Sequence, residues 1–319
     1  MAQHFLLSRA ARTLSLAKVA RMSEEEAHEA FRLIRWCDTG GDPVCPRCGG
    51  LEHSFITTRK LWKCKACKHQ FSVTSGTIFA SRKLPIGTYL LAIAIFVNGA
   101  KGHSALQLSR DLDVQYKTAF VLSHKLREAV AAETAEHTAS GEVEVDGAYF
   151  GGHVRPENRK ADRKDRRKAE NQSGKRQSVI VVRERQGRTV SFVAASEGAS
   201  VATVAARIAL GSTVYADEAA GWDKLHARFL TKRINHSESY SDGEACTNQA
   251  ESYFARLRRA EMGIHHRISG QYLGAYAGEM AWREDHRRKS NGVQYLMMAG
   301  AALAHPVSRQ WKGYWQRSK

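Results

Sequence analysis

Four cysteines in two CxxC pairs constrain the fold of this chain more than any other feature. Cys45 and Cys48 form the first pair, Cys64 and Cys67 the second, and fifteen residues lie between the pairs. Each pair lets two thiolates reach one tetrahedral ion from a tight turn, and the intervening residues suit a hairpin that returns the second pair to the first. The spacing predicts a zinc ribbon with a structural zinc ion, because protein ligands fill all four positions. Redox cysteines are the alternative, although a redox CxxC needs no second pair at this distance.

A strong positive charge indicates a polyanionic partner. The chain has 49 Lys and Arg against 32 Asp and Glu, a formal net charge of +17 and a pI of about 9.8. This charge exceeds what solubility requires, so nucleic acid is the first candidate and a ribosome-associated or merely basic protein is the alternative. Lysines around the second cysteine pair give the ribbon a basic surface, for which DNA binding and protein docking both remain open.

The remaining composition favours a cytoplasmic protein. The longest apolar run, Tyr89 to Val97, is about half of the roughly 18 residues that a membrane span needs, so we expect no membrane partner. Cys37 and Cys246 stand alone, and this distribution of cysteines suits a reduced cytosol with bound metal better than a disulfide framework. A DNA partner would further make the protein nucleoid-associated.

The sequence changes from helical to sheet-forming patterns near residue 140. Ser23 begins a capping-box pattern that predicts a short helix ending near Trp36, and the helical pattern resumes from Leu84 to about Ala132. After Gly141 the hydrophobic period becomes two. The pattern predicts strands near 143–146, 178–182, 189–194 and 213–216, and helices over 199–210 and 248–259. Strands followed by helices indicate a mixed α/β sheet in the second half.

Residues 104–127 predict two helices joined by a short turn at Asp113 and Val114. The pattern resembles a helix-turn-helix, whose second helix enters the major groove of DNA, and an ordinary helical hairpin is the alternative. Polar residues of the second helix face outward in this arrangement. Lys117 and Lys125 are therefore predicted DNA contacts.

A basic segment separates the first two predicted strands. Residues 153–176 contain ten Lys and Arg against four Asp and Glu and almost no apolar residue, so the segment cannot fold alone. We interpret it as an insertion whose basic residues, Arg166 and Arg167 among them, contact DNA phosphates. A solvated loop without a role is the alternative.

Three acidic residues occupy places from which they can converge. Asp146 ends the first predicted strand before a glycine-rich turn, Asp217 ends the fourth, and Glu251 lies near the start of a helix. Asn248 precedes Glu251 by three residues on the same helix face, and Arg258 follows it by seven. Taken alone, each acid would be a solvated or capping residue. Together they suit phosphodiester cleavage, for which carboxylate oxygens bind Mg²⁺ or Mn²⁺.

The order of these motifs is specific. The succession CPRC, CKAC, VEVDGAYFGG, VYADEAAGW, HSESY, TNQAESYFARLRR and EMAWRED resembles the ISXO-like group of bacterial insertion-sequence transposases, from about Arg35 to Arg288. The resemblance implies a zinc ribbon joined to a DDE catalytic core of RNase H-like fold. It implies catalytic, metal-binding roles for Asp146 and Asp217, with Glu251 or Asn248 as the third member.

The resemblance also implies how the protein acts. Two or more protomers would bring the ends of an element together on double-stranded DNA, cleave the 3′ strand ends and use the new 3′-OH groups to attack target DNA. Arg258, and with it Arg259, would contact the terminal DNA. Cys246 departs from the histidine that the family often has there, and residues 282–287 depart from the family's later basic segment, but neither removes a proposed metal ligand.

Two other functions remain open: a zinc-ribbon DNA-binding regulator with a non-catalytic sheet, and a nuclease of the same fold.

The expected organisation is a helical segment (1–40), a zinc ribbon (41–80), a helix-turn-helix-like module (81–138), an RNase H-like α/β domain with flanking helices (139–290, with the insertion 153–176) and a C-terminal tail (291–319).

Overall fold

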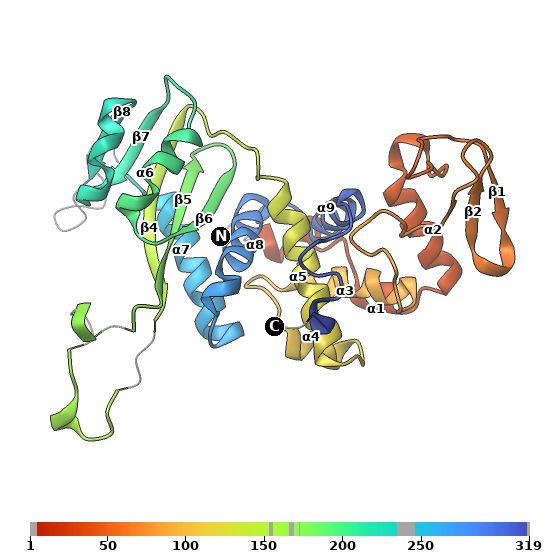
Figure 1. The fold of residues 1–319 in the computed structure, drawn as a ribbon, viewed down its shortest axis with the longest axis horizontal. Coiled ribbons are helices and arrows are strands. Elements are labelled where there is room, and N and C mark those ends of the chain that lie inside the picture. The colour runs from red at the N-terminus through yellow and green to blue at the C-terminus, as the bar shows by residue number, and fades with distance from the viewer. Residues whose placement is uncertain (1–4, 153–155, 166–168, 172, 235–245, 318–319) are drawn as a thin grey trace. The chain divides into compact units, whose positions relative to one another are not determined.

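The computed structural model describes residues 5–152, 156–165, 169–171, 173–234 and 246–317 (Figure 1). The chain forms two compact units, one made of Met1–Ala132 with His286–Lys319 and the other of Glu133–Asp285. Within the described ranges, none of the helices combines the length and the low polarity that a bilayer crossing requires.

The first unit begins with the cysteine-bearing module. Helix α1 spans Leu16–Ala20 and α2 spans Glu24–Arg35, starting from the capping box that the sequence predicts. Strands β1 (His53–Ile56), β2 (Leu61–Cys64) and β3 (Gln70–Phe71) form an antiparallel sheet in that order. Trp62 is buried between Trp36 and Phe71, with ring centroids 5.2 and 5.9 Å away. Aromatic packing thus joins α2 to the ribbon.

Helices α3 (Ile86–Asn98), α4 (Ala105–Asp111), α5 (Tyr116–Ala132) and α9 (Asn291–Ala304) complete this unit. Helix α3 is apolar along most of its length and contacts α1, α2 and α9. The predicted turn between α4 and α5 includes Asp113 in the left-handed region, with φ 51°. The helical pair of the expected helix-turn-helix is therefore present.

The segment expected as a C-terminal tail differs from the expectation. It contains α9, which contacts α2, α3 and α5. Its buried residues follow a helical period: Tyr295, Met298, Ala299, Ala302 and Leu303. Beyond α9, Trp311 stacks on His124 of α5 with ring centroids 4.3 Å apart. Both ends of the chain therefore contribute to one core.

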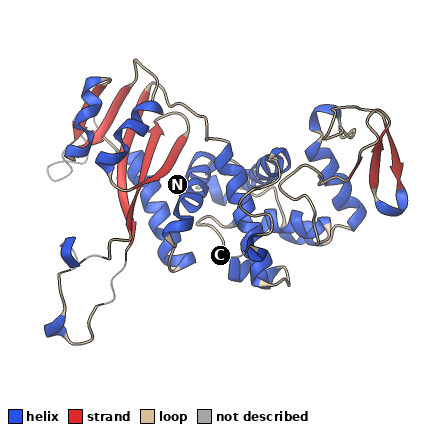
Figure 2. Ribbon diagram, in the orientation of Figure 1, coloured by secondary structure: helices blue, strands red, loops and turns tan. Residues whose placement is uncertain are grey.

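The second unit is built on a five-stranded mixed sheet with the order β6-β5-β4-β7-β8 (Figure 2). The strands are β4 (Glu142–Gly151), β5 (Arg176–Glu184), β6 (Thr189–Ala194), β7 (Thr213–Asp217) and β8 (Leu230–Ile234). Strands β4, β5 and β6 are antiparallel neighbours, whereas β7 and β8 run parallel to β4. This confirms the predicted α/β class and the RNase H-like mixed sheet.

Helices cover both faces of this sheet. Helix α6 (Glu197–Ala206) and the 3₁₀ helix η7 (Ala220–Ala227) pack on one face, with Val143 and Val145 of β4. Helices α7 (Asn248–Ala260) and α8 (Gly270–His286) pack on the other, with Ala148 and Phe150. Since successive strand residues point to opposite faces, Asp146 lies on the side of α7.

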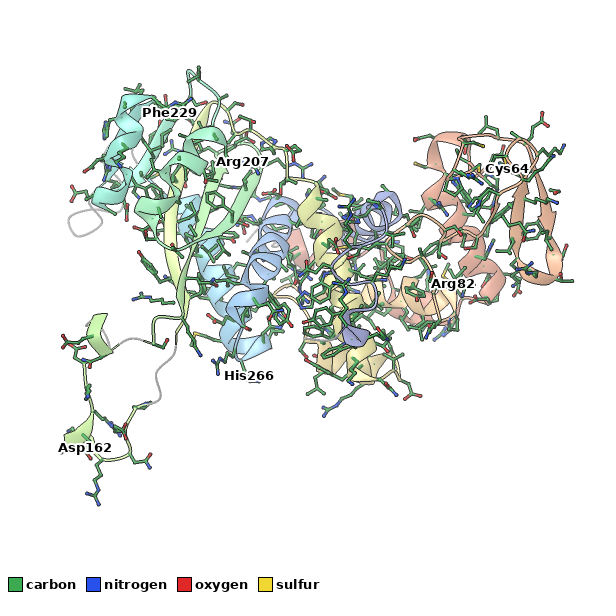
Figure 3. All side chains as sticks on the ribbon, in the orientation of Figure 1. Cys64, Arg82, Asp162, Arg207, Phe229 and His266 are labelled. Carbon is green, nitrogen blue, oxygen red and sulfur yellow. The ribbon has the colours of Figure 1, made fainter. Side chains whose placement is uncertain are left out.

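Strand β4 is longer than the sequence pattern indicates, and Asp146 lies inside the strand instead of at its end. The sequence places a turn from Gly147, but Gly147 pairs with Ile180 and the strand continues to Gly151. The turn starts at Gly151 and Gly152, whose φ values of 72° and 65° suit glycine. The basic segment, in which Figure 3 labels Asp162, follows this turn.

Candidate functional site

The four cysteines of the ribbon come together, as their spacing predicts. The Sγ atoms of Cys45 and Cys67 lie 3.6 Å apart, as do those of Cys48 and Cys64, and all four lie within 4.8 Å of one another. A tetrahedron with Zn–S bonds of about 2.3 Å has edges of about 3.8 Å, so the cluster fits a zinc ion. Figure 3 labels Cys64 in this structural zinc site.

Local turns explain how the ribbon builds the cluster. Each CxxC turn closes on a left-handed residue, Gly49 (φ 71°) or Lys68 (φ 59°). The amides of these residues donate to the carbonyl oxygens of Cys45 and Cys64 at 2.9 and 3.0 Å. The backbone N–H of Cys67 lowers the pKa of the Cys64 thiol, whereas the neighbouring thiols raise the pKa of Cys48, so Cys64 is the more readily deprotonated of the two.

Asp146 and Asp217 lie side by side on neighbouring parallel strands. Val145 of β4 pairs with Ala216 of β7, so each aspartate occupies the next position of its strand. Val145 and Ala216 belong to the core on the α6 side, and the aspartates therefore face the α7 side. The backbone N–H of Gly147 donates to Asp146 Oδ1 at 2.7 Å.

Helix α7 brings the two candidates for the third position to this side of the sheet. Glu251 is half-buried in the first turn of α7, and its charge acts on Asp146. Asn248 is the first residue of the helix and is exposed. The buried face of α7 packs on β4 and β5 through Ala250, Tyr253, Phe254 and Leu257. This packing sets the rotation of the helix about its axis.

A fourth carboxylate, which the sequence analysis missed, approaches the aspartates from the α6 face of the sheet. Glu197 begins α6 and is half-buried. A Cβ atom at Gly147 would lie 2.7 Å from Glu197 Oε1, so the Glu197 side chain fills the space that this glycine leaves. A glycine inside a strand is a signal of such a close approach. The sequence does not identify Glu197 as the residue that approaches Gly147, because fifty residues separate the two positions.

The electrostatics of this group are those of crowded carboxylates. Burial raises the pKa of Asp146 to about 7, and the charges of Asp217, Glu197 and Glu251 act in the same direction, against the hydrogen bond from Gly147. Burial and the charge of Asp217 also raise the pKa of Glu197. A divalent cation would relieve this repulsion, and carboxylate oxygens are the donors that Mg²⁺ and Mn²⁺ prefer. The donor chemistry of these carboxylates suits such an ion, whereas among the described residues the four cysteines alone bring three or more ligand atoms within 4.8 Å of one another.

The residues predicted to contact DNA lie in different settings. Arg258 and Arg259 are exposed in the last turn of α7. Lys117 is exposed at the start of α5, with its Nζ 5.4 Å from the ring centroid of Trp315. Lys125 is half-buried instead of facing outward, and burial lowers its pKa. Arg166 and Arg167 lie outside the described residues.

The segment 282–287, which departs from the family pattern, holds α8 in place. Asp285 pairs with Arg183 and accepts hydrogen bonds from the backbone N–H and the hydroxyl of Thr189 at 3.1 and 2.6 Å. Glu284 pairs with Arg256 of α7 at 2.9 Å. These buried pairs tie α8 to the sheet and to α7.

A four-cysteine ribbon and an RNase H-like sheet with acidic residues on β4, β7 and α7 are the combination that the resemblance to DDE transposases predicts. Comparison with known proteins agrees: residues 22–70 match the transposase zinc-ribbon domain, and residues 138–285 match the ISXO2-like transposase domain. These two matches confirm the resemblance of the chain's motifs to the ISXO-like transposases.

A curated relative supports this assignment. The uncharacterized protein in transposable element ISH50 of Halobacterium salinarum is 24% identical over 280 residues, which cover 84% of this chain and 93% of the relative. No solved structure matches the chain.

Proposed function

We propose that this transposase cuts and rejoins DNA strands with the carboxylates of Asp146, Asp217 and Glu251. The observation that carries the proposal is the placement of the two aspartates at adjacent positions of parallel strands, on the sheet face that α7 covers. Bound Mg²⁺ or Mn²⁺ ions would stabilise both the attacking and the leaving oxygen of the phosphodiester. The protein itself orients these ligands, with Asn248 at the start of α7 and Glu197 at the start of α6.

The remaining modules supply recognition in this proposal. Residues 41–80 and 81–138 bind the terminal inverted repeats of double-stranded DNA, and residues 139–290 carry out cleavage and strand transfer. Arg258 and Arg259 contact phosphates, as do the basic insertion 153–176 and Lys117. Two or more protomers assemble on the paired ends, and DNA as the substrate implies a cytoplasmic, nucleoid-associated protein.

The test is strand cleavage and joining on a DNA fragment that carries the element's own end, with Mg²⁺. We expect metal-dependent cleavage followed by joining to a target fragment. Cleavage without joining would favour a nuclease of the same fold. DNA binding without cleavage, under Mg²⁺ and Mn²⁺ alike, would favour a DNA-binding regulator and would overturn the proposal.

The third ligand can be identified with paired variants. We expect Glu251→Gln to lower cleavage about 10³-fold, because loss of a ligand removes several kcal/mol of transition-state stabilisation. Asn248→Ala is expected to cost less, about tenfold, because Asn248 is exposed at the first position of α7 and carries no charge. Measured cleavage rates in the opposite order would assign the third position to Asn248.

Metal binding is expected to depend on pH through Asp146. Its pKa of about 7 means that the carboxyl is protonated in mildly acidic solution, and a cation must displace that proton. Affinity for Mn²⁺ is expected to rise about tenfold per pH unit below 7 and to level off above it. Calorimetric titrations between pH 5.5 and 8.5 would measure this, and a flat profile would contradict it.

A further inference from the structure

We propose that Glu144 is a positioning residue that fixes the start of α7, and therefore Glu251 and Asn248, relative to the strand that carries Asp146. The proposal rests on the proposed function, because it assigns a role in arranging the same carboxylates. In the proposed function, Glu144 itself neither binds metal nor contacts DNA.

Glu144 caps α7 from the neighbouring strand. Its side chain is only 1% exposed and lies two residues before Asp146 on β4, on the same face of the sheet. Its Oε2 accepts hydrogen bonds from the backbone N–H groups of Gln249 and Ala250 at 2.8 and 3.0 Å. First-turn N–H groups have no partner inside a helix, and a carboxylate at this end also interacts favourably with the helix dipole. One strand therefore holds both the metal-facing Asp146 and the cap of the opposite helix.

Arg185 completes this connection. Its Nε lies 3.1 Å from Glu144 Oε1, so the two carboxylate oxygens serve different partners. Its Nη2 donates to the carbonyl oxygen of Cys246, just before α7, at 3.1 Å. The guanidinium lies 3.7 Å from the ring centroid of Tyr215, two residues before Asp217. Gln249 Nε2 donates back to the Arg185 carbonyl at 3.0 Å. The approach to α7 is thus held by Glu144 of β4, by Arg185 directly after β5 and by Tyr215 of β7.

The pair of Glu144 and Arg185 contributes more to the orientation of α7 than to the stability of the fold. A buried ion pair contributes little net stability, because desolvation offsets much of its attraction, and in some proteins its role is to specify a geometry. Ala250, whose N–H is held, directly precedes Glu251. Any loosening at the start of the helix therefore moves both candidates for the third position, and a displacement of about 1 Å in a catalytic group can cost roughly 10²-fold in rate.

Glu144→Gln in the zinc-loaded, full-length protein tests the proposal, with Mn²⁺ as the probe. The amide keeps the side-chain shape but loses the charge that faces Arg185. We expect Mn²⁺ affinity, measured by electron paramagnetic resonance of the free ion, to fall at least about tenfold, as for other groups that orient ligands. Should Glu144→Gln fail to fold, Arg185→Lys leaves the Glu144 cap in place and is expected to lower the affinity about threefold.

The matched control is Glu279→Gln. It breaks the buried Glu279–Arg283 pair of α8, at 2.8 Å, in the same unit. We expect it to lower the melting temperature and to leave Mn²⁺ affinity unchanged. Wild-type affinity in folded Glu144→Gln or Arg185→Lys protein, or an equal loss in Glu279→Gln, would overturn the positioning role alone. Wild-type protein that bound no Mn²⁺ would overturn the proposed catalytic site and the positioning role with it.

Discussion

Asp146→Asn is expected to abolish strand cleavage and, at the same time, to make the protein more stable at neutral pH. Cleavage should fall by about 10³-fold or more, because the substitution removes a central metal ligand. The gain in stability arises because burial and neighbouring carboxylates oppose the charge of Asp146. We expect roughly 1–3 kcal/mol, less than the full pKa shift implies, because Asp146 is partly exposed.

The pH dependence of this gain has a definite sign. The pKa of Asp146 is about 7 in the folded protein, above the value of about 4 in an unfolded chain, so folding loses stability as the pH rises between these values. The Asp146→Asn variant does not lose stability in this way, because asparagine carries no ionisable group. In thermal melts of metal-free protein, the melting temperature of Asp146→Asn should therefore exceed that of wild type between pH 5 and 8, and the two values should converge near pH 4.

Glu218→Gln is the control for Asp146→Asn. Glu218 is an exposed acid that directly follows Asp217, and its replacement should change neither cleavage nor melting temperature. A lower melting temperature for Asp146→Asn than for wild type at pH 8 would show that the surroundings do not destabilise the ionised form of Asp146.

Features set by short-range chemistry were predictable from the sequence. The CxxC spacing predicts the thiolate cluster, because each turn is local and only the hairpin between them must close. Short apolar runs rich in β-branched residues and bounded by turn residues predict β5, β6 and β7, because such runs suit strands that are buried over most of their length. Helix α7 is likewise visible from its apolar face.

Features that depend on distant partners were not predictable. The course of β4 past Asp146 depends on pairing with β5, across the whole basic insertion. Glu144 looks like an outward-facing strand residue until α7 is placed over it, and Glu197 is an ordinary first-turn acid until it meets Gly147. In each case a long-range contact decides the environment of the side chain.

Loss of zinc is expected to unfold the ribbon and to leave the second unit folded. The ribbon strands are only four, four and two residues long, and its aromatic core is small. Structural zinc contributes about 10–16 kcal/mol of apparent binding free energy in small domains of this kind, so the ribbon cannot compensate for its loss. The sheet of the second unit has an apolar core of its own on each face. Its stability should not depend on the cysteines.

Hydrogen exchange of Cys64→Ser protein measures both effects. Amides of β1 and β2 should lose about 10²-fold or more of their protection, while those of β4 and β5 keep theirs. Cys37→Ser is the matched control, because Cys37 is an exposed cysteine outside the cluster, and it should retain full zinc content and protection. Full protection of β1 and β2 in zinc-free Cys64→Ser protein would mean that the aromatic packing around Trp62 holds the ribbon without metal. Loss of protection in β4 as well would mean that the two units unfold as one.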